Sequence, residues 1–299
     1  MNLNLTTANK NWHATGALIA AILALTISPL FVRWADAPGV ITSFYRMLIA
    51  GFILTPITLI TFKKYGFPNK KALLFPVLAG IFTALDHGLW ATSIENTTIA
   101  NATLLNNISP LWVALFALLV WKEKLGFRFW LGLIVVIMGA SAVLGSTIIF
   151  RPEFVSGDFL ALASSFFYAG FYLVTQRGRL LFNTLTFLWI MLLSAMICIL
   201  IYVLLKGIPI FGYSLNTYLL FISAALISQL AGYFLITYAL GKLPASVVTP
   251  SMVAQPVLTA LIAIPLAGER LLIWQFLGGL LSMVGIYVIN REKRGTALE

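Results

Sequence analysis

Ten long apolar stretches make up most of this chain, and they restrict its possible folds more than any other feature. An α-helix needs about 20 apolar residues to cross a bilayer, and each stretch is about that long. The stretches fall at 14–34, 39–62, 72–93, 98–121, 127–146, 157–176, 184–205, 216–240, 245–267 and 271–290. The sequence therefore predicts an all-α integral membrane protein with ten transmembrane helices.

The composition excludes several other classes of protein. Of the 299 residues, 61% are hydrophobic and 9% are charged, against about 45–50% and about 25% in soluble domains. So few charges cannot cover a soluble surface, which excludes a soluble enzyme and a nucleic-acid-binding domain. The only cysteine, Cys198, lies in an apolar stretch, so a disulfide scaffold is excluded as well. We find no P-loop and no cluster with metal-ligand spacing, and we expect no cofactor and no metal.

The positive charges predict the orientation of the chain in the membrane. If all ten stretches cross, 14 of the 19 lysines and arginines fall on the side of the N-terminus, 4 fall on the other side, and Arg46 lies within the second stretch. Lysine and arginine accumulate in cytoplasmic loops, so we expect both termini in the cytoplasm. This bias explains the net charge of +10 without nucleic acid as a partner.

The two halves of the chain contain a repeat. A shift of 146 residues superimposes, without a gap from about 98 to 143, the pairs Pro110 and Pro256, Glu123 and Glu269, Gly132 and Gly278, and Gly139 and Gly285. We expect repeats at 13–147 and 155–291, with short cytoplasmic segments at 1–12 and 292–299. Because five spans are an odd number, the second repeat is inverted, as is common in secondary transporters. The alternative is a duplication that only built a stable bundle.

The chain resembles the EamA family of the drug/metabolite transporter superfamily. The resemblance rests on the two five-helix repeats, the segment from Pro110 to Glu123 before a glycine-rich fifth helix, and the early Phe44-Tyr45-Arg46. It implies an exporter or exchanger of amino acids or other small metabolites in a bacterial inner membrane. It also implies that the first, third and fourth helices of each repeat line the central pathway.

Polar side chains are costly in lipid, so their positions are informative. They concentrate in the first, third and fourth spans of each repeat, whereas the fifth, seventh and tenth spans are nearly bare. We infer a water-accessible cavity between the six polar spans. The alternative is that these groups only form hydrogen bonds between helices. The bare spans suit either lipid or a second copy of the chain, which leaves a homodimer open.

Eleven residues are candidates for binding a substrate. The depth of each residue follows from the helical rise, which places Arg46, Asp86 and the Asn106-Asn107 pair roughly 5–7 Å outside the midplane. Trp90 shares a helix face with Asp86, where it could stack on a substrate or mark the membrane interface. The candidates are Arg46, Asp86, His87, Trp90, Asn106 and Asn107 in the first repeat and Tyr168, Tyr172, Gln229, Tyr233 and Gln255 in the second.

Three charged or titratable candidates have alternative roles. Asp86 and His87 could couple transport to protons. Asp86 could instead form an ion pair with Arg46 that only neutralises two membrane charges, and a hydrogen bond to Asn107 would satisfy His87. If Asp86 does not neutralise it, Arg46 could attract a carboxylate.

Several prolines lie within the apolar spans, and we single out Pro29, Pro110, Pro256 and Pro265. Each removes a backbone hydrogen bond, so each could act as a hinge or form a static kink.

Together these features predict a secondary-active transporter of a small molecule that works by alternating access, and not an enzyme. One alternative is a membrane-embedded enzyme acting on lipid-linked substrates, although the charged residues of the external loops are scattered. A passive channel is the other alternative.

Overall fold

The computed structural model describes residues 3–65, 70–121, 126–252, 254–268 and 272–296, and these residues are almost entirely helical. Glu123 and Glu269, which the repeat superimposes, lie outside the described residues. The helices are α1 (Leu3–Thr26), α2 (Ser28–Trp34), α3 (Gly39–Tyr65), α4 (Leu74–Asn96), α5 (Ile99–Asn106), α6 (Ser109–Trp121), α7 (Phe127–Phe150), the 3₁₀-helix η1 (Pro152–Phe154), α8 (Val155–Gly178), α9 (Thr184–Leu205), α10 (Leu215–Ser223), the π-helix η2 (Ala224–Gly232), α11 (Tyr233–Leu240), α12 (Ala245–Ser251), α13 (Ala254–Ala267) and α14 (Ile273–Thr296).

Eight helical stretches in the described part of the chain are long and apolar enough to cross a membrane. They are Trp12–Trp34, Gly39–Lys64, Leu74–Asn96, Ile99–Phe116, Pro152–Gly178, Thr184–Leu205, Leu215–Leu240 and Ala245–Ala267. At the places of the fifth and tenth predicted spans, α7 and α14 contain shorter apolar stretches, Phe127–Gly139 and Ile273–Gly285. The prediction of an all-α, multi-pass membrane protein is thus confirmed.

Three of the predicted spans are broken a few residues before a proline. The first span breaks between α1 and α2 at Ile27, before Pro29. The fourth breaks between α5 and α6, before Pro110, and the ninth between α12 and α13, before Pro256. Proline cannot donate a backbone hydrogen bond and crowds the preceding turn, which explains the position of each break. Pro265, by contrast, lies inside α13 without ending it.

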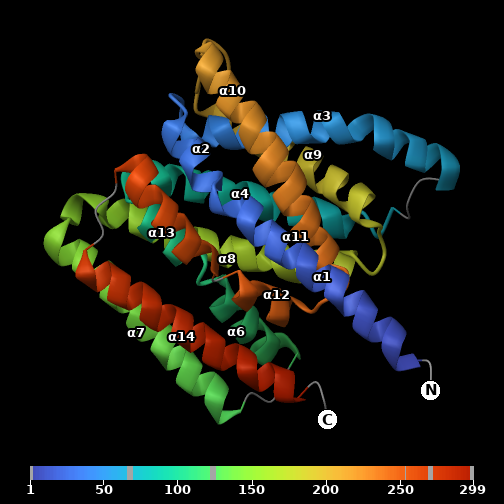
Figure 1. Cartoon of the computed structure of the whole chain (residues 1–299). Helices are drawn as coiled ribbons and strands as arrows, with labels where there is room; N and C mark the ends of the chain where they lie inside the picture. The colour runs from blue at the N-terminus through green and yellow to red at the C-terminus, as the bar shows by residue number, and fades with distance from the viewer. Residues whose placement is uncertain (1–2, 66–69, 122–125, 253, 269–271, 297–299) are drawn as a thin grey trace.

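The bundle is built around long helix pairs that come from distant parts of the sequence (Figure 1). Helix α4 packs against α8 and α9, and α3 packs against α9. Helix α1 packs against η2, α11 and α13, so the first span is in contact with helices from the second half of the chain. The start of α1 and the end of α14 lie toward the same end of the bundle.

Helices α7 and α14 form a close pair at one side of the bundle (Figure 1). A Cβ atom at Gly139 would lie 2.5 Å from the carbonyl oxygen of Gly278, and one at Gly285 would lie 2.6 Å from that of Gly132. These are the four glycines that the repeat superimposes, and they let the two backbones touch, as small residues do in membrane helix pairs.

Candidate functional site

A small polar cavity lies between the two halves of the chain. Its volume is about 30 Å³, which is enough for one or a few water molecules. Eight of the eleven candidate residues line it, together with Leu25 and Ser28. The eight are Arg46, Asp86, His87, Trp90, Asn106, Tyr168, Tyr233 and Gln255.

The break in the first span gives the cavity one of its walls. Pro29 has no N–H, so the carbonyl of Leu25, four residues earlier, loses its donor in the helix. The side chain of Gln255 in α13 donates from Nε2 to this carbonyl over 3.1 Å. Thr259, one turn further along α13, donates from its hydroxyl to the carbonyl of Thr26 over 3.0 Å. The second half of the chain therefore satisfies the backbone groups that the first half leaves open.

Asp86 joins three helices at the cavity. The Nδ2 atom of Asn106, the last residue of α5, donates to Asp86 Oδ1 over 2.8 Å. The same Nδ2 lies 2.8 Å from the hydroxyl of Ser164 in α8. His87 Nδ1 lies 3.3 Å from Asp86 Oδ2, a close contact without hydrogen-bond geometry. A carboxylate and an imidazole thus lie side by side in a buried site.

Arg46 is completely buried but only partly satisfied. Its Nη2 donates to Gln229 Oε1 over 3.2 Å, and within the described residues its Nε and Nη1 atoms have no hydrogen-bond partner. No direct ion pair joins Arg46 to Asp86 in this part of the chain, although both side chains line the cavity. A buried guanidinium with open donors is costly unless an acceptor reaches it, so this site is chemically suited to an anion.

Gln229 reaches Arg46 from an unusual piece of backbone. It lies in η2, a π-helix of nine residues within the eighth predicted span. Such segments are rare and often occur at functional sites. No pattern in the sequence distinguishes this π-helix from an α-helix, so it was not predicted.

Aromatic rings form the remaining wall of the cavity. The His87 ring lies 5.9 Å from the ring of Trp90 and 5.3 Å from that of Tyr233, measured between centroids. Trp90 is buried, so its place is in the cavity rather than at the membrane interface. Tyr172 lies behind Tyr168, with centroids 4.5 Å apart, and supports the wall without lining it.

Asn107 is the candidate that the structure places away from the cavity. Its Nδ2 donates to the carbonyl of Thr103 in its own helix over 2.9 Å, and no hydrogen bond joins it to His87 among the described residues. Ser28 and Ser164, in turn, belong to the site but were not candidates. Both are hydroxyl side chains within apolar spans, which is a weak signal because such groups often bond only to their own helix.

The charged residues at the ends of the helices near Asn96 are engaged in contacts between helices. Asp158, at the start of α8, accepts from the Thr97 hydroxyl over 2.6 Å and from Asn101 Nδ2 over 3.0 Å. Arg33 Nη2 donates to the carbonyl of Thr97 over 2.6 Å, and Glu95 accepts from the backbone N–H of Gly39. These hydrogen bonds hold neighbouring helices together, which is a structural role.

At the opposite ends of these helices, Arg179 joins α8, α9 and α11. Its guanidinium donates to the carbonyl of Thr237 over 3.1 Å, to the hydroxyl of Thr184 over 2.7 Å and to the carbonyl of Phe182. Burial lowers the pKa of this guanidinium from its usual value. The contacts are those of a structural clamp.

Several proteins named as transporters are similar to this chain in sequence, and one solved structure is similar in fold. An "Uncharacterized transporter" of Methanothermobacter thermautotrophicus is 25% identical over 73% of this chain, but the match spans only 64% of that relative. An "Uncharacterized transporter" of Archaeoglobus fulgidus is 31% identical over 41% of this chain and 43% of its own length. "Uncharacterized transporter YdfC" of Bacillus subtilis is 23% identical over 81% of this chain and 78% of its own.

One crystal structure covers 92% of this chain and 96% of its own, with a TM-score of 0.65 and 18% sequence identity, which shows a common fold. The family model of the EamA-like transporter family matches residues 12–145 and again residues 155–291. The two matches cover most of the chain, and the chain therefore belongs to the EamA-like transporter family.

Proposed function

We propose that this protein is a secondary-active transporter that exports or exchanges amino acids or similar small metabolites with a carboxylate. It resides in a bacterial inner membrane with both termini in the cytoplasm. Its ten crossings form two inverted five-helix repeats that alternate in opening the central site. Membership of a transporter family supports transport rather than an enzymatic reaction. The observation that carries the proposal is the buried Arg46, whose Nε and Nη1 atoms lack partners among the described residues.

The charges around the cavity match a zwitterion. A guanidinium binds a carboxylate through two parallel hydrogen bonds along one edge. Nη2 of Arg46 donates one of its two N–H groups to Gln229, so its second N–H, together with that of Nε or Nη1, can bind a carboxylate. Asp86 lines the same cavity and can accept an ammonium group. An α-amino acid carries both groups, so it would satisfy the two buried charges together.

The size of the cavity implies that the site must open to admit a substrate. A volume of about 30 Å³ has room for only one or a few water molecules, so this arrangement is too narrow for an amino acid. The breaks between α1 and α2, between α5 and α6, and between α12 and α13 border this cavity. Broken helices bend more readily than continuous ones, and we assign to these three breaks the movements that admit and release the substrate.

The contact between Asp86 and His87 supports proton coupling. The two groups are 3.3 Å apart and buried, so uptake of a proton by one changes the field at the other. In the proposed cycle, a proton on this pair weakens the hold on the ammonium group and assists its release.

Counterflow in proteoliposomes tests the proposed function. Vesicles are preloaded with a mixture of amino acids and related metabolites, and the entry of each labelled compound is followed for the parent protein, Asp86→Asn and His87→Ala. Saturable counterflow by the parent and its loss in Asp86→Asn support the proposal. Flux without counterflow would indicate a channel, and no flux of any amino acid or metabolite would overturn the proposed substrate class.

A further inference from the structure

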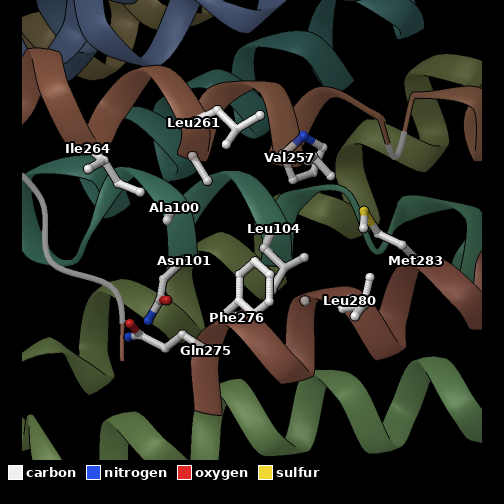
Figure 2. A pocket seen from close by; sticks show the side chains of 13 residues that line it. Ala100, Asn101, Leu104, Val257, Leu261, Ile264, Gln275, Phe276, Leu280 and Met283 are labelled. Atoms are coloured by element: carbon white, nitrogen blue, oxygen red, sulfur yellow. The ribbon is translucent and has the colours of Figure 1, made fainter. Parts of the chain in front are cut away.

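A second pocket lies between α5, α13 and α14, and it shares no lining residue with the polar cavity. Its volume is about 180 Å³, and apart from one end its wall is apolar. Figure 2 shows Leu104, Leu261, Phe276 and Met283 around it, from all three helices. Leu261 and Phe276 are 62% and 58% exposed outside the bundle, so in a membrane this pocket is open to the lipid.

The polar end of the pocket is formed by two amides. Figure 2 shows the side chains of Asn101 and Gln275 pointing toward each other at one end. Asn101 is held by Asp158, to which its Nδ2 donates over 3.0 Å. Gln275 accepts from the backbone N–H of Leu272 over 2.9 Å, but its Nε2 has no hydrogen-bond partner within the described residues. Gln275 is only 4% exposed, so among the described residues its Nε2 is a buried donor without an acceptor at this end.

The depth of this end in the membrane follows from the helices. Gln275 lies in the first turn of α14 and Asn101 in the first turn of α5. The polar end therefore lies near the membrane boundary, where the ester groups of phospholipids are found. From Phe276 to Met283 the apolar wall extends along α14 for roughly 10 Å toward the interior of the membrane.

We propose that this pocket binds one acyl chain of a membrane phospholipid, with the ester carbonyl accepting a hydrogen bond from Gln275 Nε2. The ester supplies an acceptor and no donor, which is what the open N–H requires. An apolar cavity of about 150 Å³ stays dry and takes up apolar molecules, so water does not compete in the remainder of the pocket. Among the described residues, those that line the pocket are uncharged, which suits an acyl chain and its ester. The bound lipid fills the space between α14 and the helices α5 and α13.

Photo-cross-linking tests the proposal without any transport substrate, so its outcome does not depend on the proposed function. The full-length protein is placed in vesicles of phosphatidylcholine that carries a diazirine in one acyl chain, and labelled residues are mapped by mass spectrometry. We expect labelling of Leu104, Phe276 and Met283 to exceed that of Phe52, which is 78% exposed on α3. Equal labelling of all exposed apolar residues would overturn the proposal.

Gly279 offers a matched pair of variants. A Cβ at this position would lie 3.7 Å from Leu104 Cδ1, so Gly279→Ala fits, whereas the larger side chain of Gly279→Leu would occupy the pocket. We expect the excess labelling to persist in Gly279→Ala and to fall to the level of Phe52 in Gly279→Leu. Gln275→Leu keeps a side chain of similar size at this end but removes the donor, and its labelling should fall below that of the parent. Unchanged labelling in folded Gly279→Leu, or in Gln275→Leu, would contradict the proposed site.

Discussion

The contact between α7 and α14 yields a prediction about stability that can be worked out from the coordinates. In Gly139→Ala the new Cβ would lie 2.5 Å from the carbonyl oxygen of Gly278 and 2.6 Å from the backbone nitrogen of Ser282. Both atoms belong to the backbone of α14, so no side chain can turn aside, and the two helices must separate. Overpacking of this kind costs about 1–3 kcal/mol.

The same substitution also has a favourable effect, which sets the net result. Alanine in a helix interior is favoured over glycine by about 0.5–1 kcal/mol. Gly139→Ala should therefore lower the free energy of unfolding by about 0–2.5 kcal/mol, with a central value of about 1 kcal/mol. Gly279→Ala, on the same helix pair, meets only Leu104 at 3.7 Å, so it should leave stability unchanged or raise it by up to about 1 kcal/mol.

Reversible unfolding in mixed micelles, followed by circular dichroism, measures both variants against the parent. We expect Gly139→Ala to unfold more readily than the parent and Gly279→Ala not to do so. A gain in stability by Gly139→Ala as large as that of Gly279→Ala would refute the prediction, because the close approach of the two backbones would then be absent in the folded protein.

Three further substitutions test other contacts. Asn106→Ala removes the hydrogen bond to Asp86, worth about 1.5–3 kcal/mol, so the substrate concentration at half-saturation in counterflow should rise about tenfold or more. Asn107→Ala loses only a bond within its own helix, and it should change this concentration less than about twofold. Thr259→Val keeps the shape of the side chain but leaves the Thr26 carbonyl without its donor, and the free energy of unfolding should fall by about 0.6–1.7 kcal/mol. Arg179→Met removes the clamp between α8, α9 and α11, and thermal unfolding should show a loss of about 1–3 kcal/mol.

A specific outcome would contradict each of these predictions. Equal effects of Asn106→Ala and Asn107→Ala would mean that the bond to Asp86 does not shape the binding site. A Thr259→Val protein as stable as the parent would show that another group satisfies the broken helix. An Arg179→Met protein with parental stability would show that solvent replaces the clamp.

Much of the fold could be predicted from the sequence, because the thickness of a bilayer fixes the length of an apolar helix. The prolines also gave three of the helix breaks, since a missing N–H acts locally. Pro265 shows the limit of that reasoning, because α13 continues through it. Whether neighbouring helices tolerate a proline depends on packing, which the sequence does not reveal.

The sequence predicted how deep the candidate residues lie in the membrane, but not which side of its helix each residue faces. The helical rise placed Arg46, Asp86 and Asn106 at one level, and the structure brings all three to one cavity. Asn107 is at nearly the same depth, but successive residues turn by about 100° around a helix, and it bonds to its own helix instead. The bond from Arg46 to Gln229 joins residues 183 positions apart through a π-helix, and no local pattern indicates such a pairing.

The most direct measurement is counterflow of a labelled amino acid by the parent protein and by Arg46→Met, in the same proteoliposomes. Methionine fills a similar volume without the charge, so the variant keeps the packing but loses the carboxylate partner. An amino acid and its methyl ester should be compared as competitors. We predict that in the parent protein the unlabelled amino acid competes with the labelled one and that the methyl ester does not. Arg46→Met should remain folded and show no counterflow. Parental counterflow by Arg46→Met, or equal competition by the ester, would contradict the role assigned to the buried guanidinium.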